Sequence, residues 1–244
     1  MSGEAYANTG LLVLGSGPPR AEKTIVVMGL ARSGTSLVAG SLQRLGVWMG
    51  ANAPPPVYED TRLGAAIEAG DLAAARAVIR EYDAGRAVWG WKRPASLHHI
   101  TAIHRLLRNP VYVVIFRDVF AIANRNRVSM GSEVMSNMRR SLEEYDKLLD
   151  FLEESAPPAL LVSYDKALRH KEDFIDRLCE FLHLPADAEA RRRAAEFITP
   201  SPEAYLQRTR PRSIVGHVDV IRRDRVEGWA ARQPESGDSG ALQV

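Results

Sequence analysis

The sequence contains one cysteine, Cys179, among its 244 residues. A single cysteine excludes an internal disulfide framework and a cysteine-rich metal site. Long apolar runs are also absent, and none approaches the roughly 18 residues that a helix needs to cross a bilayer. The short apolar stretch at residues 11–14 follows no basic cluster, unlike the core of a secretory signal. We therefore expect a soluble, cytoplasmic protein.

Charge of one sign is not in excess, because the formal net charge is only +2 at pH 7. This balance argues against a dedicated nucleic-acid-binding protein. Lysine is scarce: of the 32 basic residues five are lysine, and the others are arginine. The guanidinium fork of arginine suits phosphate and sulfate, although a biased genome composition produces the same excess. The positions of the arginines, rather than their number, therefore have to indicate a ligand.

The overall composition is that of a globular protein. Hydrophobic residues make up 45% and charged residues 25% of the chain, which excludes a disordered or fibrous protein. A chain of this length fits either one large domain or one domain with a short appendage. Residues 1–22 mix glycine, proline, serine and polar residues without periodicity, and we predict a flexible leader there. The main domain is predicted over residues 23–215, and a tail over residues 216–244.

Short β-branched runs alternate with segments of helical spacing. Strands are predicted at residues 24–28, 87–91, 111–116 and 159–164. Helices are predicted at residues 36–45, 72–79 and 97–107, from about residue 120, and at residues 136–152, 173–184 and 190–197. This alternation predicts an α/β fold with three layers, in which helices cover both faces of a parallel sheet. Ligands of such sheets bind at the carboxyl ends of the strands.

A glycine-containing loop follows the first predicted strand. Its residues 29–36 match the spacing G-x-x-x-x-G-[KT]-[ST], with Thr35 where a nucleotide triphosphatase carries lysine. The glycines let consecutive backbone N–H groups face an anion, and the helix predicted to begin at about Ser33 adds its positive end. The alternative is an ordinary turn between strand and helix. We predict anion binding by five loop residues: Arg32, Ser33, Gly34, Thr35 and Ser36.

These residues resemble those of sulfotransferases that use 3′-phosphoadenosine 5′-phosphosulfate (PAPS), in particular the bacterial branch of that family. The R-S-G-T-S sequence at residues 32–36 is similar to the family's loop for the donor's 5′-phosphosulfate. Further similarities follow in the family's order at V-W-G-W-K-R-P (residues 88–94), V-V-I-F-R-D (113–118), L-V-S-Y-D (161–165) and F-L-H-L (181–184). The resemblance implies a P-loop NTPase-like sulfotransferase fold and PAPS as donor substrate, without a metal.

The resemblance assigns a second group of arginines to the donor's 3′-phosphate. Arg117 occupies the family's arginine position for that group. Arg125 stands eight residues later, where the family usually has serine, and a longer cation there could still bind phosphate. Arg210 lies in a basic segment that would close over the nucleotide, or would form a solvated loop. Two further departures are Arg93, where an acidic or hydroxyl residue is common, and Val119, where proline is usual.

Sulfuryl transfer requires cations, hydrogen-bond donors and a base. Arg32 and the loop amides supply the first two, and Lys92, at the end of a predicted strand, is the second cation unless it is a solvated strand-end lysine. Glu59 is the preferred base, because V-Y-E-D at residues 57–60 resembles the [FY]-E-D element of bacterial members. Asp60 is a candidate helix cap. His98 and His99 are the alternative base, although their helical setting favours the surface.

The resemblance therefore implies a PAPS-dependent sulfotransferase, which we expect to act on a hydroxyl or amine of a carbohydrate, glycolipid or small-molecule acceptor. The alternatives are a P-loop kinase without the usual lysine and a non-catalytic nucleotide-binding protein. In the tail, the pattern G-H-V-D…V-E-G-W-A resembles the opening of a small β-rich module of bacterial carbohydrate-modifying proteins. The tail is then a truncated start of that module, or a disordered extension. The acceptor and the oligomeric state are not readable from the sequence.

Overall fold

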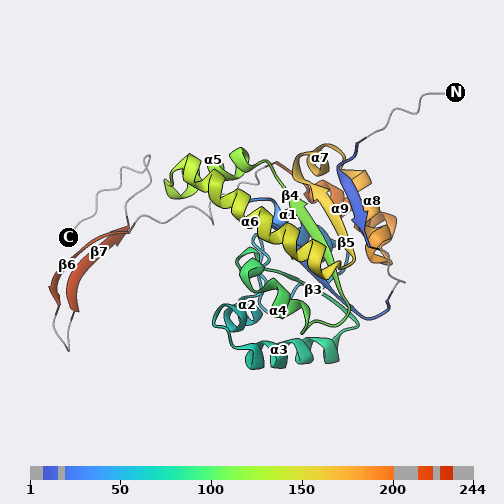
Figure 1. Ribbon diagram of the computed structural model, residues 1–244, viewed down its shortest axis with the longest axis horizontal. Coiled ribbons are helices and arrows are strands. Elements are labelled where there is room, and N and C mark those ends of the chain that lie inside the picture. Colours follow the sequence, from blue (N-terminus) through green and yellow to red (C-terminus); the bar gives the residue numbers. More distant parts are fainter. Residues whose placement is uncertain (1–7, 16–19, 201–213, 222–225, 233–244) are drawn as a thin grey trace. The chain divides into compact units, whose positions relative to one another are not determined.

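The computed structural model describes residues 8–15, 20–200, 214–221 and 226–232 (Figure 1). The chain divides into two units, Met1–Arg208 and Thr209–Val244. Among the described residues, no helix is both long and apolar enough to pass through a membrane.

The first unit is built on a five-stranded sheet with the order β1-β5-β4-β2-β3. The strands are β1 (Leu11–Leu14), β2 (Lys23–Met28), β3 (Val88–Lys92), β4 (Pro110–Phe116) and β5 (Ala159–Ser163). Strands β2 to β5 are parallel, as predicted, whereas β1 runs antiparallel to β5. Strand β2 is buried along its whole length, which accounts for the apolar and β-branched run T-I-V-V-M at residues 24–28.

Part of the segment predicted as a flexible leader is a strand. Residues 11–14 pair with β5, and Leu11 lies opposite Val162. Four residues are too few for a periodicity that identifies a strand by itself. They are ordered here because they cover the otherwise unpaired backbone N–H and C=O groups along the edge of β5.

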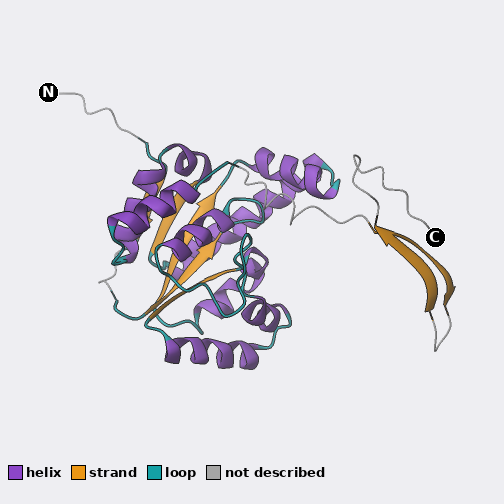
Figure 2. Cartoon of the chain, turned by 180° about the vertical axis from the view of Figure 1, so that it is seen from behind, coloured by secondary structure: helices purple, strands orange, loops and turns teal. Residues whose placement is uncertain are grey.

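Helices cover both faces of the sheet, which confirms the predicted three-layer α/β architecture (Figure 2). Side chains alternate along β2, so that Ile25 and Val27 enter one apolar cluster while Val26 and Met28 enter the other. The first cluster includes side chains of α1 (Thr35–Arg44), α7 (Tyr164–Arg169), α8 (Lys171–Leu182) and α9 (Ala188–Phe197). The second includes those of α2 (Thr61–Glu68), α3 (Leu72–Gly85), the 3₁₀ helix η1 (Pro94–His99), α4 (Ile100–His104) and α6 (Val134–Ser155).

The bounds of several helices differ from those predicted; α3, for example, extends to Gly85 rather than to residue 79. Helix α5 (Val119–Met130) packs against α6, which begins two residues before its predicted start. The single helix predicted over residues 97–107 is instead η1 followed by α4. His99, at their junction, has φ −119°, which lies outside the α-helical region and interrupts the helix.

The described residues of the second unit are two antiparallel strands. Strand β6 (Ile214–Ile221) pairs with β7 (Val226–Arg232), and the register places Ile214 opposite Arg232. The register shifts between Val218 and Val220, as at a β-bulge. The assignment of this tail to the start of a β-rich module remains a prediction.

Candidate functional site

The predicted anion loop connects the carboxyl end of β2 to α1. Three of its residues have positive φ: Gly29 (+151°), Arg32 (+71°) and Gly34 (+110°). At Gly34 an added Cβ would overlap the ring of Tyr164, so that only glycine fits there. Helix α1 begins at Thr35 rather than at Ser33, because the backbone of Gly34 is not helical. The loop therefore curls tightly in front of the first turn of α1.

The loop hydroxyls lie in different surroundings. Ser33 is fully buried, and its Oγ has no hydrogen-bond partner among the described residues. Thr35 is also buried. Ser36 differs, because its Oγ donates to the carbonyl of Val57 at 3.1 Å and so connects α1 to the segment before α2. Ser33 is the loop hydroxyl that most needs an acceptor.

Arg117, which follows β4, contacts the loop across 85 residues of sequence. Its Nη1 donates to the carbonyl oxygen of Arg32 at 3.0 Å, and its guanidinium carbon lies 4.3 Å from the ring centroid of Tyr164. Its Nε is buried without a hydrogen-bond partner in the described part of the chain. The backbone N–H of Arg117 donates to Oη of Tyr145, which donates back to the Arg117 carbonyl. The structure thus brings the two predicted phosphate-binding segments together.

Two other arginines, Arg125 and Arg210, were predicted to bind the 3′-phosphate. Arg125 lies within α5 and is half-buried. Arg210 lies outside the described residues. Their assignment to the 3′-phosphate remains a prediction.

Glu59 and Lys92, predicted as base and second cation, form an ion pair. Lys92 Nζ lies 2.6 Å from Glu59 Oε1, and Arg93 Nη1 lies 2.6 Å from Glu59 Oε2. Lys92 is only 1% exposed. Its burial lowers its pKa, and the charges of Arg93 and Arg32 act in the same direction, whereas the carboxylate of Glu59 opposes them. The positive charge of Arg32 on the loop therefore acts electrostatically on Lys92.

Arg93 extends this ion pair to a residue that the sequence does not single out. Its Nε and Nη2 donate to the two carboxylate oxygens of Glu68, the last residue of α2, at 2.6 and 2.8 Å. These hydrogen bonds are the largest cause that lowers the pKa of Glu68. One signal for this contact was present in the sequence, the unusual arginine at position 93. Nothing in the sequence indicated that Glu68 is its partner.

Asp60 serves the structure, as its predicted capping role required. It is fully buried, and its Oδ1 accepts from the backbone N–H groups of Arg62 and Leu63 at the start of α2. Its Oδ2 accepts from the N–H of Ala51 at 3.1 Å and from Oη of Tyr82 at 2.7 Å. With both oxygens engaged by neutral donors, Asp60 is not available to a ligand.

The two alternative bases lie on η1, beyond Lys92. His98 is exposed and His99 is half-exposed, in agreement with their expected surface location. His99 lies close enough to Glu68 to contribute to the lowering of its pKa, although less than Arg93 does. In the described part of the chain, no group of three or more His, Cys, Asp and Glu side chains is arranged to hold a metal ion.

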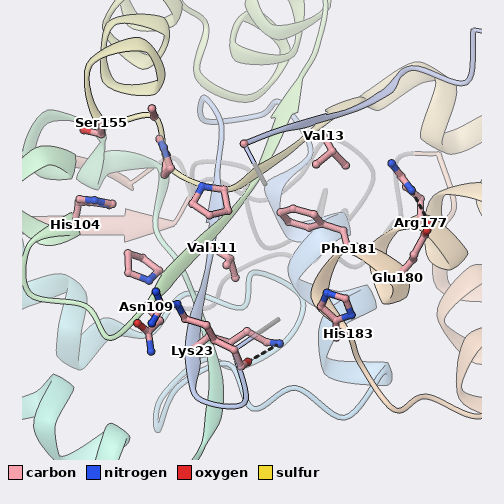
Figure 3. A pocket seen from close by; sticks show the side chains of 16 residues that line it. Val13, Lys23, His104, Asn109, Val111, Ser155, Arg177, Glu180, Phe181 and His183 are labelled. Carbon is pink, nitrogen blue, oxygen red and sulfur yellow. Dashed lines mark hydrogen bonds and ion pairs between the residues drawn. The ribbon is translucent and has the colours of Figure 1, made fainter. Parts of the chain in front are cut away.

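A cavity of about 520 Å³ lies at the opposite end of the sheet, beside the amino ends of β2 and β4 (Figure 3). Lys23 and Val111 line it together with Phe181 and His183 from the end of α8. Lys23 Nζ donates to the carbonyl of Arg20 at 3.2 Å, and burial lowers its pKa. None of the predicted site residues in the described chain lines this cavity, so it is separate from the loop, Arg117 and Glu59.

Comparisons with known proteins find sulfotransferases, both by family model and by structure. A model of the sulfotransferase family matches residues 48–188. Sulfotransferase STF9 from Mycobacterium avium has a similar structure, with a TM-score of 0.50 and 14% identity over 75% of this chain and 69% of that one. Sulfotransferase STF1 from Mycobacterium tuberculosis H37Rv gives a TM-score of 0.50 and 14% identity over 77% and 75%. No curated protein sequence matches the chain significantly. The structural similarities confirm the predicted sulfotransferase fold.

Proposed function

Because this chain belongs to the sulfotransferase family, we propose that it transfers a sulfuryl group from PAPS to a hydroxyl or amine of a carbohydrate, glycolipid or small-molecule acceptor. One observation carries the donor assignment. Ser33 Oγ and Arg117 Nε are buried donors that lack acceptors among the described residues, and both belong to segments that meet at the loop. A buried polar group without a partner costs about 1–3 kcal/mol, so an anion that supplies acceptors here would be strongly favoured.

The donor would be bound at its two charged ends. The curled loop, the positive end of α1 and the hydroxyls of Ser33 and Thr35 suit the 5′-phosphosulfate. Arg32 adds a cation there. At the other end, Arg117 is the ligand that we assign to the 3′-phosphate, with Arg125 and Arg210 as further candidates. ATP lacks a 3′-phosphate, so a requirement for Arg117 would favour a sulfotransferase over a kinase.

Glu59, Lys92 and Arg32 would carry the transfer step. The acceptor oxygen or nitrogen forms a bond to sulfur while the bond from sulfur to the bridging oxygen breaks. The electron pair of that bond leaves on the 5′-phosphate of 3′-phosphoadenosine 5′-phosphate. Glu59 takes the proton of the acceptor, and Lys92 and Arg32 stabilise the charge that develops on the bridging oxygen. The contribution of the protein is mainly positioning and electrostatic stabilisation.

The donor assignment is tested by melting temperature, since a ligand that binds the native state raises it. We expect 3′-phosphoadenosine 5′-phosphate to stabilise the protein without added metal, and 5′-AMP and ADP to have little effect. Arg32→Ala and Arg117→Ala should each remove the stabilisation. The matched control is Arg105→Ala, because Arg105 is an exposed arginine remote from the loop in sequence. Stabilisation that survives in both site variants would contradict the assignment.

Two other results would select the alternative functions. Stabilisation by ADP with Mg²⁺ alone would indicate a kinase. Stabilisation by 3′-phosphoadenosine 5′-phosphate, with no transfer of labelled sulfate to any of a panel of sugars, phenols and amines, would indicate a nucleotide-binding protein without catalysis. Transfer of the label to one acceptor class would establish the reaction and identify the acceptor chemistry.

A further inference from the structure

Four charged side chains form a continuous line from the end of β3 to both ends of α2. Lys92 contacts Glu59, Glu59 contacts Arg93, and Arg93 contacts Glu68, with the closest N–O distance of each pair at 2.6 Å. Glu59 lies two residues before α2, and Glu68 is the last residue of α2. Arg93 therefore connects Glu59, the carboxylate that we assign as base, to the last residue of α2.

Both oxygens of Glu59 are engaged by cations. Oε1 accepts from Lys92 and Oε2 accepts from Arg93. The Glu59 side chain is 20% exposed, so an acceptor molecule could reach it. Each of these oxygens keeps a second lone pair, so an acceptor can still approach it. Withdrawal of one cation would leave one oxygen fully open to the hydroxyl or amine of the acceptor.

Lys92 is the cation that can change partners. Among the described residues, its only ion-pair contact is with Glu59. It lies opposite Val27 of β2, two residues before the donor loop begins at Gly29, and the like charge of Arg32 on that loop acts on it. An anion bound at that loop would offer Lys92 a second partner and would offset this repulsion. Arg93, in contrast, is anchored by a bidentate contact to Glu68, and its stem passes over Gly64 of α2, where even an added methyl group would touch it.

We propose that Arg93 is a positioning residue that holds Glu59 by Oε2 while Lys92 moves from Oε1 to the bound donor. Donor binding then frees Oε1 to accept the proton of the acceptor, and the carboxylate keeps its place because Arg93 and Glu68 do not move. This inference rests on the proposed function. It goes beyond the resemblance, in which position 93 commonly carries an acidic or hydroxyl side chain.

One test of the proposal does not depend on turnover. If Lys92 is shared between Glu59 and the donor, Glu59→Gln removes the competitor and should tighten the binding of 3′-phosphoadenosine 5′-phosphate about fivefold or more, as expected for coupled sites. The gain should disappear when Lys92→Met is added, because the shared cation is then gone. Isothermal titration calorimetry measures both affinities. Unchanged affinity in Glu59→Gln, or a gain that persists in the double variant, would overturn the exchange of Lys92.

The second test concerns Arg93 and uses turnover. Arg93→Ala should lower kcat by about 10- to 100-fold, as a misplaced reacting group does, while the acceptor KM changes little. Arg93→Lys keeps the charge but not the fork, so kcat should recover only in part.

A matched control lies on the same helix. Arg62 of α2 makes a bidentate contact to Glu81 of α3 at 2.8 and 2.6 Å on the exposed surface, so Arg62→Ala removes a similar pair away from the carboxylate. It should leave kcat unchanged. Wild-type turnover in Arg93→Ala, or a fall in kcat that Arg93→Lys does not restore even in part, would overturn the positioning role. Absence of transfer by the wild-type protein would count against the proposed function instead, and the calorimetric test would still decide the exchange of Lys92.

Discussion

Two adjacent carboxylates, Glu59 and Asp60, show how the environment of a residue decides its role. Asp60 is fully buried and accepts four hydrogen bonds from neutral donors. Glu59 is partly exposed and lies between two cations at the end of β3. Substitution of Glu59 should therefore affect turnover, whereas substitution of Asp60 should affect stability.

Glu59→Gln is expected to lower kcat by about 10²- to 10⁴-fold, the usual range for loss of a general base. The amide keeps the size of the side chain but takes up no proton. Stabilisation by 3′-phosphoadenosine 5′-phosphate should be at least that of the wild-type protein. Transfer of labelled sulfate and melting temperature measure the two effects, and near-normal turnover would return the role of base to His98 or His99.

Asp60→Ala is expected to lower the free energy of unfolding by about 2–4 kcal/mol, because it removes a helix cap and leaves buried donors unsatisfied. Those donors include the hydroxyl of Tyr82, whose hydrogen bond to Asp60 lies in the interior. Urea unfolding measures the change. A loss below 1 kcal/mol, or a loss of turnover at full stability, would contradict the structural role.

At the scale of elements, the turn between β2 and α1 depends on Gly34. Alanine at φ +110° is strained, and its Cβ would also overlap the Tyr164 ring. Gly46 is a matched control, because it has φ +87° and no atom within 4 Å of an added Cβ. We expect Gly46→Ala to cost about 1–2 kcal/mol from backbone strain alone, and Gly34→Ala to cost more and to abolish donor stabilisation.

Urea unfolding and ligand-dependent melting of the two glycine variants test this expectation. Equal destabilisation of both variants would mean that the loop can shift away from Tyr164. Donor stabilisation that survives in Gly34→Ala would mean that the tight curl of the loop is not needed for anion binding.

The elements were predictable to different degrees. The interior strands β2 and β4 and the long helix α6 carry strong patterns in their sequences, and the structure contains all three. Strand β1 was not predicted, since four apolar residues become a strand only against the edge of β5. The split between η1 and α4 was also missed, because it depends on the backbone of His99 rather than on apolar spacing.

At the scale of the whole molecule, buried tyrosines should make stability sensitive to alkaline pH. Burial raises the pKa of Tyr82 and of Tyr145 to about 12, from 10.0, and raises that of Tyr112 as well. Because these folded-state pKa values are raised, the neutral hydroxyls contribute stability in full below pH 10. That contribution is lost as the pH rises from about 10 through about 12.

The measurement is urea unfolding at several pH values from 8 to 11 for the wild type and for Tyr112→Phe. The phenylalanine variant cannot release this proton on unfolding, so its free energy of unfolding should fall less steeply above pH 10. The variant also loses the hydrogen bond between Tyr112 and His104. This loss lowers the free energy of unfolding by the same amount at every alkaline pH, so it does not change how steeply that free energy falls with pH. Equal slopes for the two proteins would contradict the assignment.

The sequence by itself determined the α/β architecture and the loop with its glycines, because both depend on local periodicity and on the backbone freedom of particular residues. It also singled out Lys92 by its place at the end of a predicted strand, and Glu59 and Arg117 by the resemblance of their segments to motifs of the family. Only the tertiary structure decided the contacts of these residues: Glu59 with Lys92 across 33 positions, and Arg117 with the carbonyl of Arg32 across 85. An ion pair or a hydrogen bond depends on distances between side chains that the packed sheet and helices set, and a side chain's chemical type carries no record of its partner.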